Sequence, residues 1–122
     1  MSDHDDVRAA NQAFYTAFET LDFAAMAACW SQREEDVCVH PGWETLYGWT
    51  DIRQSWRAIF ANTEFMKIAI GDVRVEVLGD MARVSCVENL YSVTDDMTVQ
   101  AAVACTHIFL RVDASWKLTL HH

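Results

Sequence analysis

The chain has 122 residues, of which 52% are hydrophobic, and contains one proline and four glycines. This length is typical of one domain, and the composition excludes disordered, collagen-like and low-complexity chains. The formal net charge is −9 and no basic cluster is present, so we expect neither nucleic acid nor an anionic membrane as a partner.

No apolar run approaches the ~20 residues of a membrane-spanning helix, and the acidic N-terminal stretch is unlike a secretion signal. Both features predict a cytoplasmic protein. The four cysteines show no Cys-x-x-Cys spacing, and we therefore expect reduced, mostly buried thiols at Cys29, Cys38, Cys86 and Cys105.

In the first third of the chain, apolar residues recur every three or four positions, which predicts an amphipathic helix over residues 7–21. Ser2 and the acids that follow it are candidate N-caps. The pattern pauses at residues 20–22 and resumes in a short second helix over 23–30. A polar break over 31–36 ends this region.

A short strand is predicted over 37–40, ending at the Pro41-Gly42 turn signal. Residues 43–49 read as a short irregular segment. Thr50 is then the expected N-cap of a third helix. The apolar face of that helix is formed by Ile52, Trp56, Ile59 and Phe60.

From residue 65 onward the hydrophobic period changes to two, which predicts strands. We expect them over 66–77, with a bend at Gly71, and then over 82–93, 98–112 and 116–122. Helices followed by a four-strand meander are typical of an α+β architecture.

The strand predicted over 98–112 is apolar on both faces. Such a strand is covered on both sides, yet three short helices can cover only one face of the sheet. The pattern therefore predicts a homodimer formed through the sheet face.

Three stretches carry a resemblance to a known family. They are Phe14-Tyr15 through Asp22-Phe23 to Trp30, then Val39-His40-Pro41-Gly42-Trp43 with Ile52 and Trp56, and finally Phe109 through Trp116-Lys117-Leu118 to His121-His122. The chain resembles the SnoaL-like branch of the nuclear transport factor 2-like superfamily. The resemblance implies one SnoaL-like domain over residues 1–122, with three N-terminal helices packed in the concavity of a strongly curved, mostly antiparallel sheet, a cystatin-like cone that leaves an apolar pocket.

The candidate catalytic residues are His40, Glu88 and His107. His40 corresponds to a family position, just before the proline, that often holds a carboxylate base, and a histidine can act as a general base near neutral pH. Glu88 and His107 are ionisable groups within apolar strands, where burial shifts the pKa of a carboxyl group upward. The alternatives are a strand-end histidine bonded to backbone, a Glu88 ion pair with Arg83 or Arg111, and a core histidine.

Whether Glu88 and His107 share a face depends on strand register, because a slip of one residue reverses one set of side chains. In the isomerase branch a tyrosine on the first helix and an acid on a strand stabilise an oxyanion. The resemblance places Phe14 and Thr106 at those positions, with Tyr15 adjacent. Further ligand-binding candidates are Trp30, Trp43, Trp56, Phe60, Asn89, Phe109 and His121, for whose aromatic members ordinary core packing is the alternative.

These residues lead to competing hypotheses. The first is a domain that binds a small apolar or aromatic molecule and acts as a cofactor-free isomerase, cyclase or dehydratase with His40 as general base. The second is a non-catalytic module that dimerises or binds a protein partner, and a third is hydrolase or dehydratase chemistry on a hydroxylated substrate or an epoxide. We expect no cofactor and no metal, because fixed ligand spacing on a helix is absent.

Overall fold

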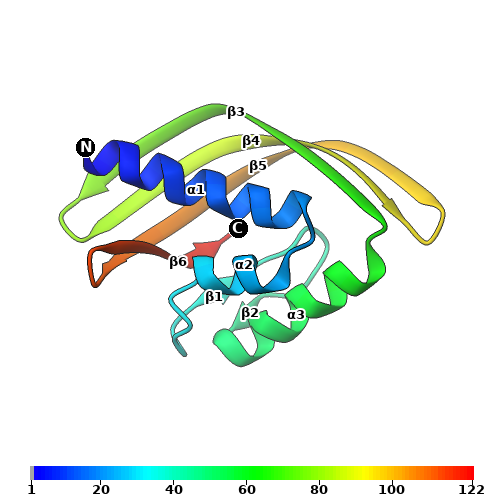
Figure 1. The fold of residues 1–122 in the computed structure, drawn as a ribbon, viewed down its shortest axis with the longest axis horizontal. Helices are drawn as coiled ribbons and strands as arrows, with labels where there is room; N and C mark the ends of the chain where they lie inside the picture. Colours follow the sequence, from blue (N-terminus) through cyan, green and yellow to red (C-terminus); the bar gives the residue numbers. More distant parts are fainter. Residues whose placement is uncertain (1) are drawn as a thin grey trace.

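In the computed structural model, which describes residues 2–122, the chain forms three helices and a six-stranded sheet (Figure 1). The helices are α1 (Asp3–Glu19), α2 (Phe23–Cys29) and α3 (Trp49–Asn62). The strands are β1 (Val37–Cys38), β2 (Leu46–Tyr47), β3 (Phe65–Leu78), β4 (Met81–Thr94), β5 (Met97–Val112) and β6 (Ser115–His121). The predicted α+β architecture is confirmed.

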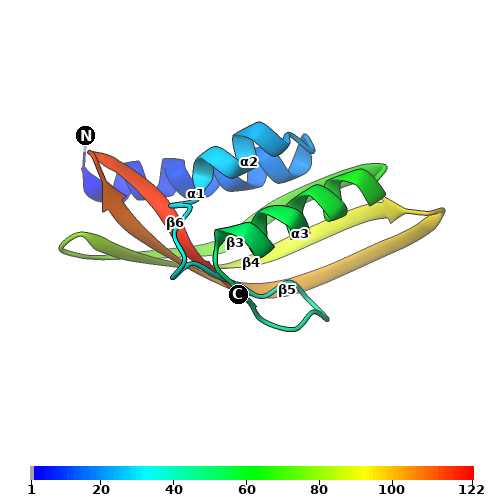
Figure 2. The same cartoon turned by 90° about the horizontal axis from the view of Figure 1, so that it is seen from below.

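The strand order in the sheet is β2-β1-β6-β5-β4-β3. All neighbouring strands are antiparallel except β1 and β6, which are parallel. The long strands β3 to β5 arch over α1, and Figure 2 shows the helices on the same side of the sheet. The mostly antiparallel, curved sheet with helices in its concavity is therefore as predicted.

The helix ends follow their capping chemistry. Ser2 caps α1 by accepting a hydrogen bond from the backbone N–H of Asp5 at 3.2 Å. The prediction that Thr50 caps α3 is wrong, because Gly48 is the N-cap and the helix begins at Trp49. Gly48 has a φ of +88°, which favours glycine.

The core lies between α1 and the inner face of the sheet. Val7, Phe14 and Trp56 are fully buried there, together with Phe109 and Leu118. A register shift between Gly71 and Arg74 produces the expected bend in β3. Among the described residues, no helix is long and apolar enough to cross a membrane.

Candidate functional site

A cavity of about 300 Å³ opens where β5 extends past the end of β6. The loop after β1 forms one wall and β5 the other. Its polar lining includes His40, Glu88, Cys105 and His121, and Trp43 adds a half-exposed indole. The structure therefore brings two of the predicted catalytic residues, His40 and Glu88, to one cavity.

His40 is buried and held by the adjacent helix α3. Its Nε2 lies 2.9 Å from Oγ of Ser55, and the Ser55 hydroxyl donates to the Ile52 carbonyl at 2.6 Å. Because a hydroxyl donates only one hydrogen, Nε2 of His40 donates to Ser55 and Nδ1 holds the lone pair. Burial lowers the pKa of His40 to about 4, so the ring is a neutral base at pH 7.

Glu88 is buried on the inner face of β4 and accepts a hydrogen bond of 2.6 Å from the Tyr15 hydroxyl. Desolvation raises the pKa of Glu88, although the Tyr15 hydrogen bond opposes the shift. Burial also raises the pKa of Tyr15. The alternative ion pair is not observed, because Arg83 pairs with Glu76 and Arg111 with Asp3 and Asp80.

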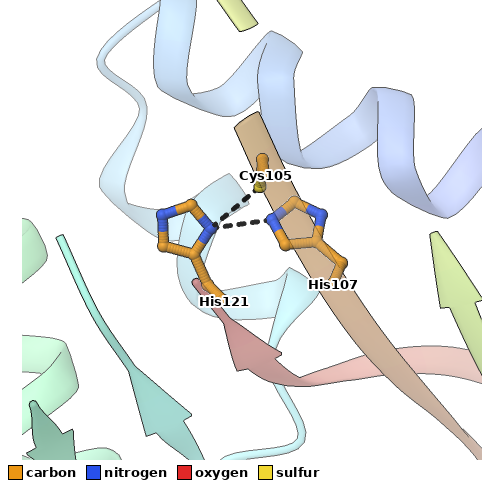
Figure 3. Close-up of side chains that lie close together, drawn as sticks. All are labelled: Cys105, His107 and His121. Carbon is orange, nitrogen blue, oxygen red and sulfur yellow. Dashed lines mark hydrogen bonds between the residues drawn. The ribbon is translucent and has the colours of Figure 1, made fainter. Parts of the chain in front are cut away.

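Behind the cavity wall, a buried chain of hydrogen bonds joins α1 to β5 and β6. Nδ1 of His107 lies 2.7 Å from Oδ1 of Asn11. On the other side of the ring, Nε2 of His107 lies 2.8 Å from Nδ1 of His121, a contact drawn in Figure 3. The amide oxygen only accepts, so Nδ1 of His107 donates to it and Nε2 of His107 accepts from His121. His121 consequently keeps its Nε2 lone pair.

His107 does not line the cavity, because His121 lies between the His107 ring and the cavity. Desolvation lowers the pKa of His107 to about 3, and the pKa of His121 falls well below its usual value for the same reason. Both rings are therefore neutral at pH 7. The strand register places Val84 opposite His107 and Val103 opposite Glu88, so the glutamate and the histidine share the inner face without touching.

The predicted aromatic ligand residues divide between the cavity and the core. Trp43 lines the cavity, and its ring centroid lies 5.0 Å from that of His40. Trp56 packs edge-on against the other side of His40 at 4.7 Å. Trp30 lies elsewhere, against Trp49. The core rings that do not line this cavity are Phe14, Phe60 and Phe109.

Two further predicted ligand residues point away from this cavity. Asn89 is exposed on the outer face of β4, where its amide donates to the Ala69 carbonyl at 3.3 Å. Thr106 is on the outer face of β5, next in sequence to His107 on the inner face. The structure does not bring either side chain to the site.

Sequence reasoning missed the residues that orient the histidines. Asn11 lies four residues after Val7 on the buried stripe of α1, and a polar residue in an apolar stripe is the signal that could have found it. Ser55 occupies a comparable position, one residue before Trp56 on α3. Both are short polar side chains: the histidine partner of Asn11 lies 96 positions away, and that of Ser55 lies 15 positions away.

The geometry combines a neutral imidazole, a carboxyl group whose pKa is raised, and an aromatic wall. Groups whose surroundings move their pKa values in opposite directions are suited to paired base and acid roles. The cavity volume is at the lower end of the range for small-molecule sites. The arrangement therefore places an imidazole suited to accept a proton and a carboxyl group suited to hold one on the wall of the same cavity.

Comparisons with family models and with solved structures point to the same group of proteins. A model of the SnoaL-like domain matches residues 7–122. Among solved structures, a candidate dehydratase of the nuclear transport factor 2-like family from Streptomyces avermitilis is 37% identical, with a TM-score of 0.91, covering 98% of this chain and 93% of that one.

Two other relatives carry different descriptions. A structure from Thiobacillus denitrificans, described as a candidate calcium/calmodulin-dependent protein kinase type II association domain, is 27% identical with a TM-score of 0.83, covering 94% of this chain and 90% of that one. F-box protein SKIP8 of Arabidopsis thaliana is 26% identical over 112 residues, which are 92% of this chain. The matched region is 46% of the plant protein, so this chain spans less than half of that length.

Proposed function

This chain belongs to the SnoaL-like domain family, and we propose that it binds a small apolar or aromatic molecule in the cavity beside His40 and catalyses a cofactor-free proton transfer there. The observation that carries the proposal is the convergence of His40 and Glu88 on one cavity that also holds Trp43. The description of the Streptomyces relative as a candidate dehydratase is compatible with proton-transfer chemistry.

In the proposed reaction, Nδ1 of His40 removes a proton from a carbon next to a carbonyl group. Ser55 fixes the ring by accepting from Nε2, which leaves Nδ1 as the basic atom. The electron pair of the broken C–H bond moves onto the carbonyl oxygen. In its protonated form the Glu88 carboxyl, whose pKa is raised, donates a hydrogen bond to that oxygen from the atom that Tyr15 does not contact. The electron pair then moves back from the oxygen, the proton held by His40 is transferred to a different carbon, and Glu88 keeps its own proton.

The size of the cavity restricts the substrate class. A volume of about 300 Å³ is at the low end for small-molecule sites, which favours molecules of one or two rings over a four-ring skeleton. Trp43 contributes a half-exposed apolar ring to the lining, and His40, Glu88, Cys105 and His121 contribute polar groups. A bicyclic aromatic ketone, which has apolar rings and one carbonyl oxygen, matches a lining with both apolar and polar parts.

The test uses 2-tetralone as the probe, with hydrogen–deuterium exchange at its α-carbons followed by NMR in heavy water. Wild-type protein should accelerate exchange, and His40→Ala should lose roughly 100- to 10,000-fold of that acceleration. His4→Ala removes an exposed histidine of α1 and should retain the full rate. Equal rates for wild type and His40→Ala, both folded by circular dichroism, would reject the proposal.

A second candidate function is a non-catalytic association module, and the uncovered outer sheet face supports it. The helices lie on the opposite side of the sheet (Figure 2), and the outer face carries small exposed side chains such as Ala69 and Ala102. We propose that a second copy of this chain covers that face. Light scattering of the purified protein should give twice the chain mass of 13.9 kDa, and a monomer at all concentrations would contradict it.

A further inference from the structure

Three side chains of metal-ligating type meet on the inner face of the sheet. Cys105 and His107 are two residues apart on β5, and His121 of β6 lies opposite His107. The ligand atoms of the three side chains all lie within 4.8 Å of one another. Figure 3 shows the three side chains pointing toward one another. All three residues are buried, and two adjacent strands fix their backbone positions.

We propose that Cys105, His107 and His121 bind one transition-metal ion of the zinc class at the floor of the cavity. One thiolate and two imidazoles form a donor set that zinc accepts readily, whereas calcium and magnesium prefer oxygen ligands. This site goes beyond the proposed proton transfer, which uses no metal.

The surroundings of His107 match those of a metal ligand. Its Nδ1 donates to Oδ1 of Asn11 at 2.7 Å, so the lone pair of Nε2 faces the other two ligands. Metal-bound histidines commonly donate their second N–H to such an acceptor, which fixes the ring and its tautomer. Among the described residues, Nδ2 of Asn11 has no hydrogen-bond partner, so the His107 ring is the contact that this amide makes.

Two of the three ligand separations are near those of a tetrahedral site. Sγ of Cys105 lies 3.7 Å from Nδ1 of His121, and the two histidine nitrogens are 2.8 Å apart. Tetrahedral zinc with its usual bond lengths separates two nitrogens by about 3.3 Å, and a sulfur and a nitrogen by about 3.6 Å. Binding therefore requires the rings to move apart by roughly 0.5 Å, a shift that side-chain rotation supplies.

We expect the fourth coordination position to face the cavity. Cys105 and His121 both line it, together with Glu88. Three protein ligands and one open position are characteristic of catalytic zinc sites, where the fourth ligand is water or substrate. The Tyr15 hydroxyl oxygen also lies 3.4 Å from Sγ of Cys105, while its hydrogen is donated to Glu88.

The protons balance in a simple way. His121 gives up the Nδ1 hydrogen that it donates to His107 and takes one at Nε2, so its net charge does not change. Cys105 loses its thiol proton to solvent. Each bound ion therefore releases one proton, and the site gains one positive charge.

The experiment titrates Co²⁺ and Zn²⁺ into chelator-treated wild-type protein. We expect one ion per chain, a thiolate-to-cobalt charge-transfer band and about one proton released per ion. Cys105→Ser should abolish the band, and His121→Gln should weaken binding strongly. Cys29→Ser and His4→Gln are matched controls outside the cluster and should bind as wild type does.

Asn11→Leu provides the sharper test, because Asn11 touches the ion only through His107. It should weaken metal affinity by about 10- to 100-fold while the charge-transfer band persists. Near-ultraviolet circular dichroism of the tryptophans checks that each variant is folded. Folded wild-type protein that binds no Co²⁺, or that shows the same band after Cys105→Ser, would overturn the proposal.

Repeating the 2-tetralone exchange assay in excess chelator separates this site from the proposed function. If wild-type protein binds no metal but still accelerates exchange, only the metal site is rejected. Metal binding without any exchange, in chelator or in Zn²⁺, rejects the proton transfer alone.

Discussion

The two faces of β5 are both rich in small and apolar residues, yet they do different things. On the inner face, Cys105, His107 and Phe109 are buried against α1 and β6. On the outer face, Ala102 and Ala104 are exposed. A strand that is apolar on both faces is therefore not necessarily buried on both. In β5, one face packs in the core and carries a polar cluster, and the other face is left uncovered by the helices.

The inner face also carries the groups whose burial opposes folding. Desolvation keeps its histidines neutral. Glu88 is buried as well, and it accepts a hydrogen bond from the Tyr15 hydroxyl. Such groups reduce stability unless they are paired, and they are concentrated at functional sites. Among the described residues, the outer face has no comparable set of buried ionisable side chains.

The largest difference between the faces should come from Phe109, which is completely buried. Phe109→Ala should lower the free energy of unfolding by about 3–5 kcal/mol, through lost burial and the cavity left behind. Val112→Ala, on a half-exposed side chain at the end of the same strand, should cost less than about 1 kcal/mol. Urea unfolding followed by tryptophan fluorescence measures both, and equal losses would contradict the comparison.

The next largest effect should be a loss of folding stability in acid, caused by groups buried on the helix side of the sheet. The pKa of His40 is lowered to about 4 in the folded protein, against about 6.5 in the unfolded chain. The unfolded state therefore binds more protons between these values, so stability falls as pH drops from 6.5 towards 4. For chelator-treated protein we expect a loss on the order of a few kcal/mol over this window.

His40→Gln checks the assignment of that acid loss. Removing His40 should reduce the slope of stability against pH between 6 and 5 by close to one proton per molecule, as measured by urea unfolding at each pH. His4→Gln, on the exposed surface of α1, should leave the slope unchanged. A His40→Gln slope identical to that of wild type would assign the acid sensitivity elsewhere.

Glu88 should show a smaller effect of the opposite sign. Its pKa is raised in the folded protein, so its favourable contribution is present below its unfolded pKa and is lost as pH rises through the folded value. Glu88→Gln retains an acceptor for Tyr15 and should stabilise the protein at pH 7 by about 1 kcal/mol. Glu76→Gln, on an exposed ion pair, should change stability by less than about 0.5 kcal/mol, and destabilisation by Glu88→Gln would contradict the account.

The smallest effect on the folded chain should come from the outer face. Ala102→Glu adds a charge at an exposed position and should change the stability of a single chain by less than about 0.5 kcal/mol. If two copies associate through this face, the same substitution converts the dimer into a monomer in light scattering. A dimer that survives Ala102→Glu and the matched Ala69→Glu would place the interface elsewhere.

Much of the fold could be predicted from the sequence because it depends on local patterns. The helical stripe of α1, the alternation from residue 65 and the Pro41-Gly42 turn signal each report a short-range preference. The start of α3 was misplaced because Gly48 is held by distant backbone groups, with its N–H donating to the Asp36 carbonyl at 2.8 Å. No local pattern contains that contact.

The site was less predictable because its geometry depends on long-range pairing. Glu88 and His107 share a face, as one of the two possible registers allows, but their partners come from α1 and β6. Tyr15 reaches Glu88 across 73 positions, and Asn11 reaches His107 across 96. Hydrophobic periodicity says that these residues are buried but not which of them meet.

The most direct test of the central claim, that His40, Glu88 and His121 surround one ligand cavity, is an NMR titration of ¹⁵N-labelled protein with 2-tetralone that follows the histidine ring nitrogens. We expect the free protein to show His40 protonated at Nε2. On binding, the His40 and His121 signals should shift, while those of His4 should not. Binding that leaves the His40 and His121 rings unchanged would contradict it.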